Sequence, residues 1–318
     1  MRWGIVATIK APLPRILDFA AWHLDLGAER LFLYLDDGDS EAARVLNAHP
    51  QINVTETGPA YWKNKGGRPD MHQNRQCRNA RHAYNRAGTL DWIAHIDVDE
   101  FLLPEGSVSA ALASLPKDAL CARMRPAEAL ARESDTPARD SMRHFKAFHV
   151  DQTARQDAAQ RIFGDASRHL SGGFLSHVAG KLFIRTGHKG LQIRIHNIRL
   201  GDVQNPGEVA LPDIPLGHFH AESWEAFLAA YRFRVTRGSY RAELKPQARG
   251  SGALKLHDLF TQIEADEGES GLRRFYDIVA LATPDLRSRL AAEGLLVSRR
   301  MDLPALVARH FGHERGSR

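Results

Sequence analysis

Blocks of apolar and polar positions alternate along the first hundred residues and predict strands and helices by turns. Apolar runs at 4–9 and 30–35 have the length of buried strands. Between them, residues 13–27 carry apolar positions at helical spacing, with a proline near the start and a glycine at the end. This order predicts an α/β fold with a mainly parallel central sheet and a ligand site at the carboxyl ends of its strands. Further elements are expected as a helix at 43–49, a strand at 52–55, a helix at 72–87 and a strand at 91–96.

The later pattern is less regular and ends in helices. Residues 154–180 are rich in Gly, Ser, His and Asp and predict an active-site loop. Ser223 is expected to cap a helix that ends before Gly238. We therefore expect one domain at 1–245 and an all-helical annex at 246–318. Within this stretch the pattern also predicts a helix at 107–115, strands at 119–125 and 144–150, and a strand pair at 181–187 and 191–197.

The amino-acid composition limits the class of protein and the kinds of molecule that it can bind. The chain has 318 residues, of which 43% are hydrophobic, enough for a sizeable core. It has no apolar run of about 18 residues and no signal-peptide core, so we expect a cytoplasmic protein. The net charge of +5 suits an anionic partner, but basic residues are interspersed with acids, and we expect no nucleic-acid partner.

One motif carries chemistry. Asp97 and Asp99 follow an apolar strand and point to the same face of an extended chain, and Glu100 comes next. Two carboxylates on one face form a hard oxygen site that suits Mg²⁺ or Mn²⁺. A short Asp-x-Asp pattern also occurs where acids merely solvate a strand end, but the preceding βαβα segments favour a nucleotide site.

At this point the sequence resembles the bacterial family 2-like glycosyltransferases with a DxDEF signature, which are related to the family 92 group. The resemblance covers about residues 3–240. Its most specific parts are the segment Asp97-Val98-Asp99-Glu100-Phe101 and the later stretch from His218 to Phe227. It departs from the family after the first strand, where Ile9-Lys10-Ala11-Pro12 replaces the frequent Asn-Glu pair.

The resemblance implies a GT-A-like, Rossmann-like domain that moves a sugar from a UDP- or GDP-sugar to a hydroxyl, with inversion, in the synthesis of a cell-surface glycan. It implies Mn²⁺ or Mg²⁺ coordinated directly by Asp99, while Asp97 contacts the donor's ribose or reaches the metal through water. His218 or, failing that, His220 completes the metal site. A packing role for either histidine is an equally open reading.

Donor-binding candidates come from the strand ends. Asp36 and Asp37 follow the second strand and are placed to accept hydrogen bonds from a base or ribose, although Asp-Gly also forms turns by itself. Thr8 and Lys10 end the first strand. Arg75, on the helix before the acidic motif, offers a guanidinium for phosphate or sugar, although a solvated basic helix face is an equally open reading.

An inverting transfer needs a base for the acceptor hydroxyl, and three residues are candidates for that role. They are Asp165, His177 and Glu222, and none lies in a distinctive motif.

Two other functions stay open: a Mg²⁺-dependent nucleotidyl- or phosphotransferase, and a non-catalytic module that binds nucleotide-sugars. The expected acceptor is a glycan or a lipid-linked glycan. Peripheral contact with the inner face of the membrane would be aided by basic C-terminal residues, namely Arg299, Arg300, Arg309, Arg315 and Arg318.

Overall fold

The computed structural model describes residues 1–36, 38–133, 141–236 and 256–312. The chain forms two compact units that are interleaved in sequence. The predicted division at residue 245 is sequential and falls on residues outside the described ranges, so it stays a prediction. The first unit comprises Met1–Pro126, Ala179–Leu216 and Asp302–Arg318, and the second comprises Ala127–Val178 and Gly217–Met301.

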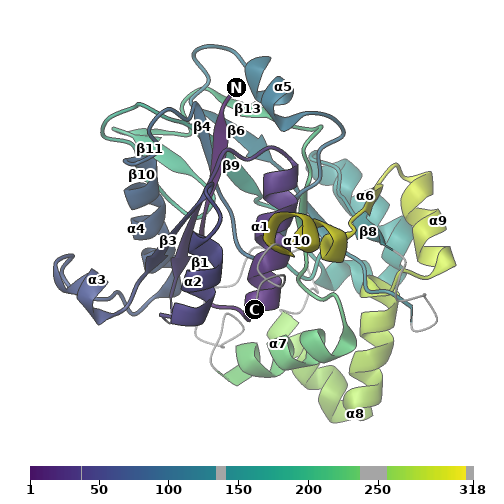
Figure 1. Cartoon of the computed structure of the whole chain (residues 1–318). Coiled ribbons are helices and arrows are strands. Elements are labelled where there is room, and N and C mark those ends of the chain that lie inside the picture. The colour runs from purple at the N-terminus through teal and green to yellow at the C-terminus, as the bar shows by residue number, and fades with distance from the viewer. Residues whose placement is uncertain (37, 134–140, 237–255, 313–318) are drawn as a thin grey trace. The chain divides into compact units, whose positions relative to one another are not determined.

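A seven-stranded sheet with the order β13-β6-β9-β4-β1-β2-β3 forms the centre of the first unit (Figure 1). Strands β3, β2, β1 and β4 are parallel to one another. Strand β9 runs antiparallel between β4 and β6. The prediction of an α/β fold with a mainly parallel sheet is therefore confirmed. The strands are β1 (Trp3–Ile9), β2 (Arg30–Leu35), β3 (Ile52–Glu56), β4 (Trp92–His95), β6 (Cys121–Met124), β9 (Lys181–Arg185) and β13 (Glu208–Ala210).

The strand order fixes which helices cover which face. The chain moves outward from β1 to β2 and β3, then crosses back to place β4 on the other side of β1. Because parallel crossovers are right-handed, α1 and α2 cover one face and α4 the other. On the α4 face, Ala80 and Ala83 pack against Val6 and Ile93. The helices of this unit are α1 (Leu13–Asp25), α2 (Ser40–Asn47), α3 (Pro59–Lys63), α4 (His72–Tyr84), α5 (Val108–Ala113) and α10 (Leu303–Phe311).

One expected pairing in this unit is wrong. The segments 181–187 and 191–197 do not form a strand pair, because β9 already lies between β4 and β6 and has no free edge. The following strand instead forms a small separate sheet. That sheet contains β10 (Gln192–Ile193), β11 (Ile198–Leu200) and β12 (Val203–Gln204).

The second unit is built around helices and an antiparallel strand group. Residues of α7 and α8, among them Phe227, Phe260 and Tyr276, form its apolar core. The side chain of Ser223 accepts a hydrogen bond from the backbone N–H of Ala226, 3.1 Å away, so the predicted helix cap is confirmed. The elements are β7 (Pro126–Ala129), β8 (Met142–Lys146), α6 (Gln152–Phe163), η1 (Gly164–His169), β14 (Leu216–His218), α7 (Trp224–Thr236), α8 (Leu256–Ala280), α9 (Pro284–Ala292) and β15 (Leu296–Arg300).

Two expectations about this unit are wrong in part. The expected loop at 154–180 begins as helix α6, because Ala158, Ala159, Ile162 and Phe163 recur on one buried face and Asp151 caps the first turn. The expected all-helical C-terminal region contains β15, which pairs with β8 along its whole length. Helices α8, α9 and α10 otherwise confirm the C-terminal helices.

Candidate functional site

The candidate site lies at the carboxyl ends of β1, β2 and β4. The direction of crossover reverses between β1 and β4, and open α/β sheets bind ligands outside the strand ends at such a reversal. We call this group of side chains the strand-end site. It consists of Asp36, Arg68, Arg75, Gln76, Asp97, Asp99 and Lys181.

Asp36, at the end of β2, is a buried carboxylate held by two guanidinium groups. Its side chain is 1% exposed. Arg75 Nε lies 3.0 Å from both carboxylate oxygens, and Arg68 Nη2 lies 3.0 Å from Oδ2. Arg75 Nη1 also donates to the backbone oxygens of Pro69 and Asp70. Arg75 thus ties the segment before α4 to the end of β2.

Asp97, after β4, is held by the residue next to Arg75. Gln76 Nε2 donates to Asp97 Oδ1, and Lys181 Nζ lies 2.7 Å from Asp97 Oδ2. Two consecutive residues near the start of α4 therefore hold the carboxylates at the ends of β2 and β4. The site is preorganised by its own hydrogen bonds.

Glu100 also contacts both Asp97 and Lys181. Its Oε2 accepts a hydrogen bond from the backbone N–H of Asp97 at 2.8 Å, and it lies 3.4 Å from Lys181 Nζ. Burial by itself lowers the pKa of Lys181, but the charges of Asp97 and Glu100 outweigh it and raise the pKa above the ordinary value. Lys181 is therefore protonated near pH 7. Asp99 is partly exposed at the same strand end.

The two candidates at the end of β1 differ in accessibility. Thr8 is buried, and its hydroxyl accepts a hydrogen bond from Asn79 Nδ2 at 3.0 Å, so it links β1 to α4. Lys10 is exposed. Asp37 lies outside the described residues.

His72 adds an exposed imidazole to the same edge. Its Nδ1 lies 3.8 Å from Asp36 Oδ2. Partial burial and the charge of Arg75 lower the pKa of His72, while Asp36 and Asp97 act in the opposite direction. The ring is therefore neutral near pH 7 and able to accept as well as donate a hydrogen bond.

The late histidines belong to the second unit. The ring centroid of His218 lies 6.5 Å from that of His177 and 5.1 Å from that of His220. The structure thus brings together three of the residues predicted from sequence. Asp165 and Glu222 are exposed in the same unit.

The positions of the His, Cys, Asp and Glu side chains test whether the protein alone can hold a metal ion. Among the described residues, no group of three or more His, Cys, Asp or Glu side chains has the geometry to hold a metal ion. Divalent Mg²⁺, however, is often held by one or two carboxylates together with substrate phosphates. Asp99 fits that second arrangement.

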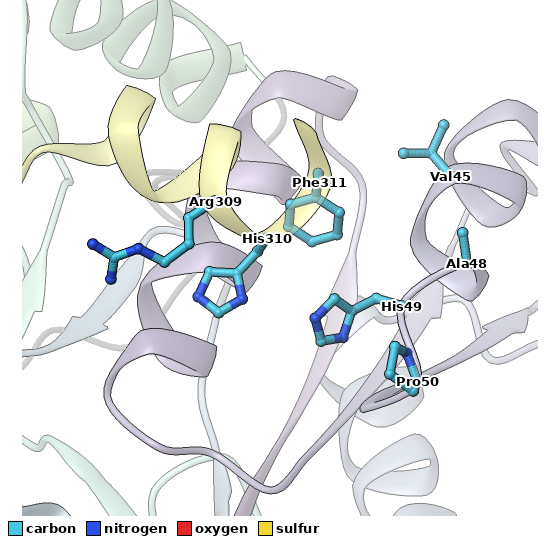
Figure 2. Close-up of a pocket in the computed structure, with 7 residues that line it drawn as sticks. All are labelled: Val45, Ala48, His49, Pro50, Arg309, His310 and Phe311. Carbon is cyan, nitrogen blue, oxygen red and sulfur yellow. The ribbon is translucent and has the colours of Figure 1, made fainter. Parts of the chain in front are cut away.

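Two cavities of the first unit lie away from the strand-end site. One, of about 360 Å³, is lined by His49 and Pro50, which precede β3, and by Arg309, His310 and Phe311 of α10 (Figure 2). The other, of about 420 Å³, is lined by Arg2, Arg30 and Leu90 among others. None of the residues of the strand-end site lines either cavity.

Sequence reasoning missed Arg68, Gln76 and Lys181. Gln76 lies in the same predicted polar helix as Arg75, whose planar guanidinium makes it the stronger candidate for contact with phosphate or sugar. The sequence does contain a signal for Lys181, because this lysine begins the otherwise apolar run Lys181-Leu182-Phe183-Ile184.

In the described part of the chain, no helix combines the length and the apolar character needed to cross a bilayer.

No protein-family model and no curated protein matches this chain. Solved structures that it resembles include 4-diphosphocytidyl-2C-methyl-D-erythritol synthase, with 15% identity and a TM-score of 0.26 over 43% of this chain and 65% of that one. The galactosyltransferase LgtC with donor and acceptor sugar analogues has 16% identity and a TM-score of 0.27 over 57% of each chain. TarS 1–349 from S. aureus has 10% identity and a TM-score of 0.34 over 100% of this chain and 92% of that one.

The chain spans less than two thirds of the length of the first two of these proteins. At such identities and TM-scores the similarities assign no activity, and the α/β fold follows from the order and direction of this chain's own strands.

Proposed function

We propose that the chain is a glycosyltransferase that binds a nucleoside-diphosphate sugar at the strand-end site and transfers the sugar to a hydroxyl. The observation that carries the proposal is the position of Asp97 and Asp99 beside the reversal of strand order, at the end of β4. Ligands of open α/β sheets bind at this place, and carboxylates there suit a divalent cation that accompanies a diphosphate.

The charges around the site support an anionic donor. Helix α4 begins at the same edge, and the partial positive charge of a helix N-terminus attracts phosphate. Arg68, whose side chain is 46% exposed beside Asp36, adds a guanidinium that reaches solvent. Lys10 adds an exposed ammonium at the end of β1. The donor diphosphate would therefore meet positive charge on several sides.

Mn²⁺ or Mg²⁺ would enter with the donor, held by Asp99 and the diphosphate oxygens. Such an ion stabilises the negative charge that develops on the leaving diphosphate. The chain's own residues would orient the donor: Asp97 is fixed by Gln76 and Lys181, and the Asp36 carboxylate is fixed by its two arginines. Whether His218 or His220 also contributes stays a prediction.

The acceptor base belongs to the proposal as well. Asp165, His177 and Glu222 remain its candidates, and all three lie in the second unit. A glycan or lipid-linked glycan acceptor and inversion of configuration come from the resemblance alone and are proposed on that basis.

Calorimetric titration of UDP- and GDP-sugars in the presence of Mn²⁺ tests the proposal, with UTP and GTP as the comparison. A nucleoside-diphosphate sugar should bind, and its nucleoside diphosphate should be released when a suitable acceptor is added. Turnover of a triphosphate with release of pyrophosphate, and no sugar transfer, would instead identify a nucleotidyltransferase.

Peripheral membrane contact is a separate part of the proposal. Arg309 forms an ion pair with Asp25, whereas Arg299 and Arg300 stand on β15. Arg315 and Arg318 lie outside the described residues. Replacement of these five arginines should reduce binding to anionic lipid vesicles in a sedimentation assay, because each basic residue near such a surface contributes about 1 kcal/mol. Unaltered partitioning of the variant would contradict membrane attachment.

A further inference from the structure

Lys181 is a lysine buried against the acidic motif. Its side chain is 1% exposed, and its ammonium lies 2.7 Å from Asp97 Oδ2 and 3.4 Å from Glu100 Oε2. Buried ammonium groups are costly unless they are paired, so this contact is an integral part of the fold.

The sheet places the lysine there. Strand β9 runs antiparallel to β4, so its first residue lies beside the last residues of β4, where the acidic motif begins. Gly180, the preceding residue, has a φ of +70°, and a Cβ on it would come within 2.1 Å of the backbone oxygen of Met124. Only glycine allows this close approach, which sets the direction in which Lys181 leaves the sheet.

Two further contacts fix the backbone before Lys181. Arg123 Nη1 donates to the backbone oxygen of Ala179 at 2.9 Å, and His196 Nδ1 lies 2.8 Å from the backbone oxygen of Gly180. The ammonium is thus attached to a rigid part of the sheet. The ammonium is buried, although the Asp97 side chain is 32% exposed, and it cannot leave Asp97 without breaking this ion pair.

This arrangement changes what the two aspartates can do. Asp97 gives one oxygen to the amide of Gln76 and the other to Lys181. A divalent cation bound directly to Asp97 would lie close to a fixed positive charge, and repulsion between like charges opposes that position.

We propose that Lys181 is a built-in counter-cation of the acidic motif, which keeps Asp97 from coordinating a metal directly and leaves metal capture to Asp99 with the donor diphosphate. Lys181 is a positioning residue in this account: it acts through Asp97. The role of the diphosphate rests on the proposed function, whereas the exclusion of metal from Asp97 does not.

The test is a titration with Mn²⁺ alone, followed by electron paramagnetic resonance and calorimetry. Lys181→Met should bind Mn²⁺ at least about tenfold more tightly than the wild-type protein. The substitution removes the ammonium that neutralises the carboxylates of Asp97 and Glu100, and the affinity of a site for a divalent cation rises with the negative charge of its ligands. Lys189→Met is the matched control: it removes one exposed lysine of the same unit and should leave the affinity within about twofold.

A double variant locates the effect. In Lys181→Met/Asp97→Asn the gain should be lost, because the newly available ligand is gone. A folded Lys181→Met protein that binds Mn²⁺ no more tightly than the wild type would overturn the proposal, and so would a gain that survives in the double variant.

If Lys181→Met does not fold, the variant Asp97→Asn provides the test. This substitution preserves the shape of the aspartate side chain and leaves Lys181 paired with Glu100. It should leave the affinity of the protein for Mn²⁺ within about threefold of the wild type, because Asp97 is not a direct ligand. A loss of Mn²⁺ binding in Asp97→Asn would overturn the proposal. All these titrations lack nucleotide, so absence of nucleotide-sugar binding would refute the proposed function without affecting this inference.

Discussion

At the scale of single residues, the acids of the strand-end site are paired within the protein. Asp36 has Arg75 and Arg68, and Asp97 has Gln76 and Lys181. Such pairs cost desolvation energy and are retained where they fix a geometry. Arg75, predicted as a donor-binding residue, uses its donors on Asp36 and on the backbone oxygens of Pro69 and Asp70. Its direct contact with a donor stays a prediction.

Replacement of Arg75 should therefore weaken the fold itself. Arg75→Met leaves the buried Asp36 carboxylate with Arg68 as its one guanidinium partner among the described residues, and loss of one partner of a buried charge pair costs about 3 kcal/mol. Urea unfolding measures this loss. Arg78→Met, which changes an exposed arginine of the same helix, serves as the control and should cost less than about 1 kcal/mol. Equal losses in the two variants would show that Asp36 does not depend on Arg75.

Replacement of Asp99 should act on binding and not on the fold. Asp99→Asn removes the charge proposed to hold the cation but preserves the side-chain shape at a partly exposed position. Mn²⁺-dependent binding of the nucleotide-sugar should fall by at least about tenfold, with an unchanged melting temperature in the absence of ligand. An undiminished response to Mn²⁺ in calorimetry would place the metal elsewhere.

At the scale of elements, helix α1 holds the strand that follows the acidic motif. Trp22 Nε1 donates to the backbone oxygen of Leu102, 2.8 Å away. The backbone N–H of Leu102 donates to His23 Nε2 at 3.3 Å, and His23 Nδ1 lies 2.8 Å from the backbone oxygen of Phe19. These contacts assign the neutral ring with its proton on Nδ1. Protonation of Nε2 would break the link to β5 (Glu100–Leu102).

The buried His23 gives stability a defined pH dependence. Burial lowers the pKa of His23 to about 3, below the ordinary value of 6.5. The unfolded chain therefore binds a proton that the folded chain does not between these values. The free energy of unfolding should fall as the pH decreases from 6.5 towards 3, by up to about 1.4 kcal/mol per pH unit for this one group.

Urea unfolding at a series of pH values measures this slope. His23→Gln should reduce the slope without abolishing it, since burial lowers the pKa of His95 to about 3 as well. A slope that is identical in the variant and the wild type would contradict the assignment of His23 as a buried neutral ring.

Elements with strong local patterns could be predicted from sequence, and those defined by distant pairing could not. Strands β1 and β2 are continuous apolar runs, and α4 lies where the polar helix was expected. Strand β9 was located correctly, but its neighbours β4 and β6 were not foreseen, because register depends on non-local contacts. The same limit applies to the site. Asp97 and Asp99 stand in a local motif, whereas Lys181 comes beside them only through the pairing of β9.

At the scale of the whole chain, each unit contains its own buried ion pair. In the second unit, Lys146 Nζ lies 3.0 Å from Glu128 Oε2, and both side chains are 1% exposed. The backbone N–H groups of Leu175 and Ser176 also donate to Glu128. Burial by itself raises the pKa of Glu128, but Lys146, His220 and these N–H groups outweigh it and lower the pKa to about 2.

Lys146→Met should destabilise the second unit by about 3–5 kcal/mol, because it leaves Glu128 buried without its counter-charge. The double variant Glu128→Gln/Lys146→Met should recover at least about half of that loss, since no unpaired charge remains. Hydrogen exchange of the amides in α6 and α8 reports the stability of this unit separately. No recovery in the double variant would show that the lysine stabilises the unit by packing and not by charge.

The central claim is that the strand-end site binds a nucleoside-diphosphate sugar together with a divalent cation. Thermal stabilisation of the purified protein by a panel of nucleotides and nucleotide-sugars, each with and without Mn²⁺, tests it most directly, because a ligand at about one hundred times its Kd adds about 2.7 kcal/mol of stability. The account predicts a rise in melting temperature that requires both one nucleoside diphosphate or its sugar and Mn²⁺, and that is lost in Asp99→Asn. If no member of the panel raises the melting temperature, or if the rise persists in Asp99→Asn, the account is contradicted.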